Sequence, residues 1–244
     1  MNALAVGATV GYQYDLRLVV LSFLISVFGS YVAMWLASGR ENSQVTVYGP
    51  AVALGGCAIW AMHFIGMAAY KTQLYVSYAV VPTVLSLLIA IVFTAFGFHL
   101  ALKGTKRLWN LLPSGIVIGS GAAAMHYLGM FGMDLRATID WDLTMVAVSV
   151  AIAIAAATVA IWLTFHVKTG GQRIFAAVIM GIAVCAMHYT GMAAATLVCV
   201  AQANRSELGF EGPYLAYLTF GVALIALGAS VAFGRIDVTA RRLP

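Results

Sequence analysis

Seven long stretches of the chain contain no Asp, Glu, Lys or Arg, and each is at least 22 residues long. They are residues 18–39, 42–70, 72–102, 108–133, 143–167, 174–204 and 212–234. An α-helix rises about 1.5 Å per residue, so roughly 20 apolar residues cross the hydrocarbon core of a bilayer. We therefore expect seven membrane-spanning helices, and a water-soluble globular fold is excluded.

The composition agrees with a chain whose main partner is the lipid bilayer. Of the 244 residues, 63% are hydrophobic and only 9% are charged, whereas soluble domains carry about 25% charged residues. The net charge is +5, but the basic residues are scattered over short loops rather than gathered in a stripe. We therefore expect no binding to nucleic acid.

The basic residues are divided unevenly between the two sides of the predicted bundle. One side has nine, namely Arg40, Lys103, Lys106, Arg107, Lys168, Arg173, Arg235, Arg241 and Arg242. The other side has four, namely Arg17, Lys71, Arg136 and Arg205. Because basic residues tend to stay on the cytoplasmic face, we expect the N-terminus outside and the C-terminus in the cytoplasm.

One string occurs three times, as AMHFIGMAA at 61–69, AMHYLGMFG at 124–132 and AMHYTGMAA at 186–194. Its histidines are 63 and 62 residues apart, which is the length of one helical hairpin with its loops. The predicted fold is thus all-α and polytopic, one domain over residues 1–244 with three parallel helix-pair repeats plus a seventh helix. The helices are expected at approximately 16–39, 47–70, 79–102, 110–133, 143–167, 173–200 and 213–235.

The repeated string carries potential metal ligands at a fixed depth. His63 and His126 each precede a charged residue by eight positions, which places both about 12 Å below the outer boundary of the membrane. Within each copy the His and the Met four residues later share a helix face. Imidazole with thioether is a soft donor set that suits copper, particularly Cu(I). The candidate metal ligands are His63, His126, His188, Met67, Met130, Met192, Met62, Met125 and Met187.

A structural interpretation of the same residues stays open. A single methionine in a membrane helix usually packs, and a single histidine often makes only an interhelical hydrogen bond. Three copies at one depth favour a site, because ionisable groups are costly in hydrocarbon and tend to mark function.

The three strings resemble the motif of the MHYT family, a bacterial integral-membrane sensor domain named for the sequence that occurs here at 187–190. The resemblance covers essentially the whole chain. It implies a copper-binding domain of the bacterial inner membrane that senses a diatomic gas such as O2, CO or NO. It also implies a cytoplasmic output domain or partner of the cyclic di-GMP type. The motif tyrosine is present as Tyr127 and Tyr189, whereas the first copy has Phe64.

Other functions remain open on the residues alone. A copper transporter or carrier could use the same ligands, but all three copies lie in the outer half of the membrane and do not continue a path inward. A haem or copper membrane oxidoreductase could use His99 and His166, which we expect instead at the cytoplasmic ends of their helices. A retinal Schiff base is excluded, because no lysine lies within a predicted span. We expect a sensor without enzymatic activity, and no output domain in the short tail.

Overall fold

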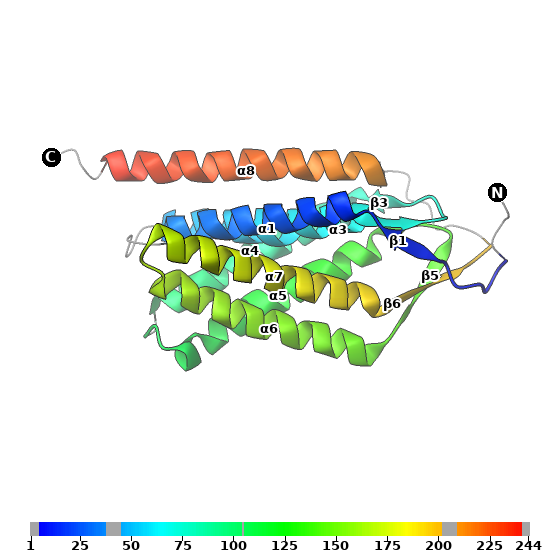
Figure 1. Cartoon of the computed structure of the whole chain (residues 1–244), viewed down its shortest axis with the longest axis horizontal. Coiled ribbons are helices and arrows are strands. Elements are labelled where there is room, and N and C mark those ends of the chain that lie inside the picture. Colours follow the sequence, from blue (N-terminus) through cyan, green and yellow to red (C-terminus); the bar gives the residue numbers. More distant parts are fainter. Residues whose placement is uncertain (1–4, 38–44, 104, 202–208, 241–244) are drawn as a thin grey trace.

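The computed structural model describes residues 5–37, 45–103, 105–201 and 209–240, with the backbone alone at 45–46, 212–213 and 233–240. Seven helices in this part of the chain are long and apolar enough to span a membrane, as the sequence predicts. They run side by side along the long axis of the molecule (Figure 1). Of the residues that predict the orientation, Arg40, Arg205, Arg241 and Arg242 lie outside the described residues.

Short strands precede or follow the helices. The helices are α1 (Leu16–Ala37), α2 (Val45–Ala51), the π-helix η1 (Val52–Ala61), α3 (Met62–Ala69), α4 (Val80–Lys103), the 3-10 turn η2 (Leu108–Leu111), α5 (Leu112–Phe131), α6 (Leu143–His166), α7 (Gly170–Ala193) and α8 (Gly212–Ala240). The strands are β1 (Tyr12–Tyr14), β2 (Tyr70–Thr72), β3 (Ser77–Ala79), β4 (Met133–Asp134), β5 (Ala137–Trp141), β6 (Ala195–Cys199) and β7 (Gly209–Glu211). Helices α2, η1 and α3 follow one another without a break and form a single span.

The strands are the main departure from the predicted all-helical chain. The helix expected at 173–200 begins earlier, at Gly170, and ends at Ala193, after which Ala195–Cys199 forms β6. This stretch pairs with β5 in the register Trp141↔Ala195 to Ala137↔Cys199. Threonine and valine favour extended backbone, and pairing with β5 satisfies backbone groups that a helix would otherwise satisfy. Apolar content alone did not distinguish this strand from the helix before it.

The strands follow the internal repeat. In each repeat the strand before the first helix pairs with the strand after the second, so β1 pairs with β2, β3 with β4 and β5 with β6, all antiparallel. Strand β7 adds to the free edge of β3. All of them lie at one end of the bundle, which we call the strand end, and α8 runs toward the opposite end (Figure 1).

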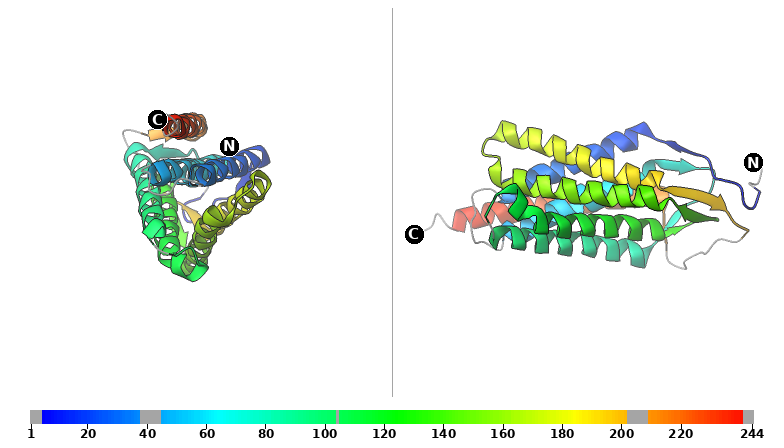
Figure 2. Two further views of the ribbon diagram at one scale, coloured as in Figure 1. Left: turned by 90° about the vertical axis from the view of Figure 1, so that its left-hand side faces the viewer. Right: turned by 90° about the horizontal axis from the view of Figure 1, so that it is seen from below.

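The spans form a three-sided bundle. Viewed along its length, α4 with α5 and α6 with α7 form two sides, α1 with the η1–α3 span forms the third, and α8 packs outside (Figure 2). Helix α1 closes the ring against α7, and α8 covers η1 and α3. As a result most of the Val47–Ala69 span is buried inside the protein, whereas most of Val80–Lys103 is not.

Two glycines allow backbones to meet around η1. A Cβ atom on Gly29 of α1 would lie 2.6 Å from the backbone nitrogen of Ala58, and one on Gly55 would lie 2.6 Å from the carbonyl oxygen of Ala90 in α4. Small residues permit this close approach of membrane helices. The π-helical span is therefore held tightly by its neighbours on two sides.

The outer faces of the spans are apolar. Leu88 and Phe96 of α4, Ile182 of α7 and Ile225 of α8 are each more than half exposed. An apolar surface that surrounds the whole bundle is unusual in soluble proteins and is what a bilayer covers. The chain is thus a multi-pass membrane protein.

Candidate metal centre

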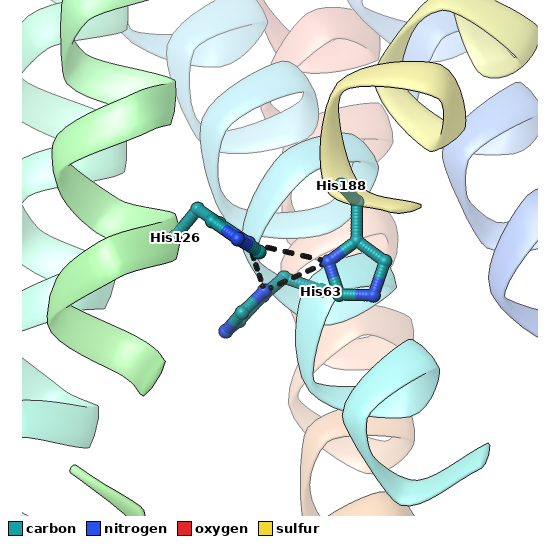
Figure 3. A group of neighbouring side chains, drawn as sticks. All are labelled: His63, His126 and His188. Atoms are coloured by element: carbon teal, nitrogen blue, oxygen red, sulfur yellow. Dashed lines mark hydrogen bonds between the residues drawn. The ribbon is translucent and has the colours of Figure 1, made fainter. Parts of the chain in front are cut away.

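The three motif histidines meet at the centre of the bundle. His63 comes from α3, His126 from α5 and His188 from α7, and their rings point toward one another (Figure 3). The Nδ1 atom of His63 lies 3.1 Å from those of both His126 and His188, and the third side of the triangle measures 3.3 Å. All three side chains are at most 1% exposed. We call this group the histidine triad.

Hydrogen bonds between the rings cannot satisfy all three Nδ1 atoms. A ring nitrogen either carries a proton and donates, or carries a lone pair and accepts. Among three nitrogens at least two have the same role, so at least one side of the triangle joins two donors or two acceptors. A cation at the centre removes this conflict, because all three nitrogens then present lone pairs to it.

The size of the triangle fits a metal ion. Imidazole nitrogens bind first-row metals such as zinc at about 2.0–2.1 Å, which places three ligands about 3.5 Å apart in a plane and about 3.3 Å apart in a tetrahedron. Among the described residues, the triad is the group of His, Cys, Asp or Glu side chains that could hold a metal ion, with ligand atoms within 4.8 Å of one another. It contains no carboxylate and no thiolate. It can hold one ion in three-fold coordination.

Each ring lies against the glycine of another motif copy. The Nε2 edge of His188 faces Gly66, where an added Cβ atom would lie 2.6 Å from it. His63 lies against Gly129 in the same way, and His126 against Gly191. The three Nε2 atoms are buried and have no hydrogen-bond partner among the described residues. The motif glycine therefore provides the space that allows the next ring to turn its Nδ1 atom inward.

A layer of aromatic rings separates the triad from the strand end. Each histidine contacts the aromatic residue that follows it, at centroid distances of 4.7–4.8 Å. Each of these rings then meets the edge of an aromatic residue that belongs to a strand, at 5.4–5.9 Å. The pairs are Phe64 with Tyr78, Tyr127 with Trp141 and Tyr189 with Tyr14. The layer shields the triad from water on this side.

Three serines link this layer, or Trp60 beside it, to the neighbouring helices, and the sequence analysis missed them. The Tyr127 hydroxyl lies 2.5 Å from Ser149 of α6, and that of Tyr189 lies 3.5 Å from Ser22 of α1. In the first copy, where Phe64 has no hydroxyl, the Trp60 indole donates to Ser86 of α4 at 3.1 Å.

A sequence signal for these serines exists. They stand in VLSFLI, VLSLLI and AVSVAI, 64 and 63 residues apart, which is nearly the spacing of the histidines. Each hydroxyl also donates to the carbonyl three residues earlier in its own helix. The internal repeat therefore extends beyond the motif that carries the histidines.

The other predicted site residues are placed as follows. The six motif methionines are all buried, at most 4% exposed, and they remain predicted ligands. His99 and His166 are exposed at the ends of α4 and α6 opposite the strand end, as expected. His166 stacks on Trp162 at 4.5 Å, and its Nδ1 atom lies 2.8 Å from the Trp162 carbonyl oxygen.

The repeat matches a known family. The family model described as "Bacterial signalling protein N terminal repeat" matches residues 1–49, 56–113, 119–177 and 181–243. The chain belongs to the MHYT family. Three of the matched units join one histidine-bearing span of the MHYT domain to the span that follows it. The unit 181–243 thus includes α8. In the prediction of three helix pairs plus a seventh helix, this helix had no partner.

Similar curated proteins are signalling proteins, and two of them carry cyclic di-GMP activities in their names. The domain is 35% identical over 92% of its length to the bifunctional diguanylate cyclase/cyclic di-GMP phosphodiesterase MucR of Pseudomonas aeruginosa. It is 33% identical over 75% of its length to the cyclic di-GMP phosphodiesterase NbdA of the same species, and 30% identical over 75% to signaling protein YkoW of Bacillus subtilis. It spans 35% of MucR and about a quarter of the other two. No solved structure matches this chain.

Proposed function

We propose that this MHYT signalling domain is a membrane sensor that binds one copper ion in the histidine triad and responds to a small gas such as O2, CO or NO. The observation that carries the proposal is the convergence of three buried Nδ1 atoms within 3.3 Å of one another. We propose that one of the motif thioethers, of Met62, Met67, Met125, Met130, Met187 or Met192, serves as an additional ligand.

The charge of the site supports Cu(I). Its three histidine ligands are neutral when they bind a metal, and the described residues bring no carboxylate into the group. A monovalent ion therefore leaves a charge of +1 in the membrane core and a divalent ion leaves +2, which costs about four times as much to desolvate because the Born energy scales with the square of the charge. Neutral nitrogen and sulfur donors also suit Cu(I).

The chain's own residues supply the coupling to the rest of the bundle. When bound, copper provides a redox-active centre that can take a diatomic ligand. His63, His126 and His188 hold its position from three different helices, so a change in their preferred spacing pulls those helices relative to one another. Ligand binding shifts the bundle only as far as it favours one helix arrangement over the other.

By analogy with the relatives, we propose that the signal passes to cyclic di-GMP enzymes. MucR and NbdA carry such activities in their names. We assign no catalytic residue to this domain. We further propose that it lies in the bacterial inner membrane with the strand end outside and the opposite end in the cytoplasm, because the basic residues favour that end.

Two alternatives are less well supported. A copper transporter or carrier needs successive sites along its path, and within the described residues the three-ligand group occurs at a single level. A haem oxidoreductase built on His99 and His166 needs inward-facing rings, whereas both side chains are exposed.

Copper content and CO binding test the proposal. We expect the purified chain to bind copper, and Cu(I)-loaded protein under CO to show an infrared C–O stretching band. A His63→Ala, His126→Ala, His188→Ala triple variant should lose both. A His99→Ala, His166→Ala double variant is the control and should retain both. Equal copper content in wild type and triple variant, or zinc or iron in place of copper, contradicts the proposal.

A further inference from the structure

A cavity of about 40 Å³ lies among η1, α5, α6 and α7. Its lining includes Ile59, Ala122 and Val184, and each of these residues is four positions before a triad histidine. Residues four apart on a helix share a face, and on α5 and α7 the separation is about 6 Å along the axis. The cavity therefore lies inside the ring of spans, one helical turn from the triad on the side away from the strands.

The cavity is lined by alanine, leucine, isoleucine, valine and methionine side chains. A space of 10–15 Å³ is enough for a water molecule, but a buried water needs two to four polar partners. This lining offers no polar side chain, so water gains little there. Apolar cavities of this kind stay dry and take up small apolar molecules, including xenon.

One side of the cavity reaches toward the lipid. Ala156 and Ala160 of α6 and Ala183 of α7 line it and are only half-buried, so they also belong to the outer surface of the bundle. Because alanine side chains are small, only a thin layer of atoms separates the cavity from the lipid between α6 and α7. Small apolar gases dissolve better in hydrocarbon than in water, so the bilayer is their reservoir.

Met187 connects the cavity to the triad. It lines the cavity and directly precedes His188. Its side chain is 3% exposed, and the unbranched thioether changes conformation more easily than a branched side chain. A molecule in the cavity therefore meets a flexible group beside the triad.

We propose that this cavity is a docking site for one small, neutral, apolar molecule of diatomic size, which enters from the lipid between α6 and α7 and reaches the triad past Met187. The inference rests on the proposed function for its role in sensing. The docking itself depends only on the cavity and requires no metal.

Xenon tests the docking in metal-free protein. With methyl-labelled methionine, rising xenon pressure should shift the NMR signals of Met180 and Met187, which line the cavity. The signal of Met145, which is 42% exposed on α6, serves as the internal reference. If the signals of Met180 and Met187 in the wild-type protein shift with xenon pressure no more than that of Met145, the proposal is overturned.

A pair of alanine substitutions on α6 tests the location. Ala157→Leu fills the cavity and should abolish the xenon shifts, whereas Ala155→Leu places the same side chain on the exposed face and should preserve them. In copper-loaded protein, Ala157→Leu should slow CO association at least about tenfold with copper content unchanged. An unchanged rate overturns the proposed route. If the wild-type protein does not bind copper, the proposed function is refuted. The xenon measurement on metal-free protein would still decide whether the cavity is a docking site.

Discussion

The Nε2 edge of His126 lies against Gly191 so closely that an added Cβ atom would overlap the ring. The same relationship joins His63 to Gly129 and His188 to Gly66, so each motif copy positions the ring of another copy. The glycines Gly66, Gly129 and Gly191 occur at the same position in all three copies of the repeated string. In the structure they determine which nitrogen of each imidazole faces the centre.

Substituting a motif glycine should therefore disturb the triad. Gly129→Ala places a methyl group against the Nε2 atom of His63, and we expect copper occupancy to fall several-fold with a loss of about 1–3 kcal/mol in stability from overpacking. Gly221→Ala on α8, where a Cβ atom meets nothing within 4 Å, is the matched control. Elemental analysis and thermal unfolding measure both effects. Full occupancy in Gly129→Ala would show that the ring does not need this space.

The Tyr127–Ser149 pair should couple α5 to α6. Their hydroxyl oxygens are 2.5 Å apart, and a hydrogen bond of this kind contributes about 0.5–1.5 kcal/mol net. Tyr127→Phe and Ser149→Ala should each destabilise the domain, and the double variant should cost less than the sum of the two. Denaturation in detergent measures the cycle. Strict additivity would mean that the contact contributes nothing.

The strand end should weaken at alkaline pH. Burial and the neighbouring Tyr12 raise the pKa of Tyr70 to about 12 from a usual value of 10.0, and burial also raises the pKa of Tyr78. Above pH 10 the unfolded chain releases these protons while the folded chain keeps them, so stability falls as the pH rises. The unfolding midpoint should decline between pH 10 and 12, and less steeply in Tyr70→Phe. Identical slopes in that variant and wild type contradict the assignment.

Labelling from one side of the membrane tests the orientation. Lys71, in β2 at the strand end, and Lys168, at the opposite end, are both exposed. In a variant in which Cys57, Cys185 and Cys199 are replaced by alanine, Lys71→Cys should react with a membrane-impermeant thiol reagent on intact cells. Lys168→Cys should react only after the cells are opened. The reverse pattern would mean that the bundle is inverted.

Much of the fold could be predicted from the sequence because the hydrocarbon core of a membrane places a simple requirement on the residues that cross it. Charge-free runs longer than about 20 residues must span, and the repeat requires its three copies to enter from the same side. The strands could not be predicted in this way, since β6 is as apolar as the helix before it. Residues 195–199 form a strand and not a further helical turn because β5 lies alongside and supplies the backbone hydrogen bonds.

The site was predicted in part. The period and the shared helix face were enough to select His63, His126 and His188. They were not enough to show that all three belong to one group, because that depends on the order of the helices around the ring. The serines were missed because only the stretch around the histidines was compared between repeats. The cavity was not foreseeable, since it arises where small side chains of α5, α6 and α7 meet residues of η1.

Copper stoichiometry in single-histidine variants tests the central claim most directly. If the triad binds one ion, wild type contains one copper per chain, and His63→Ala, His126→Ala and His188→Ala each lose most of it, while His166→Ala keeps it. Three coppers per chain in wild type, with one lost in each triad variant, would show instead that the motifs bind separately and would contradict a shared site.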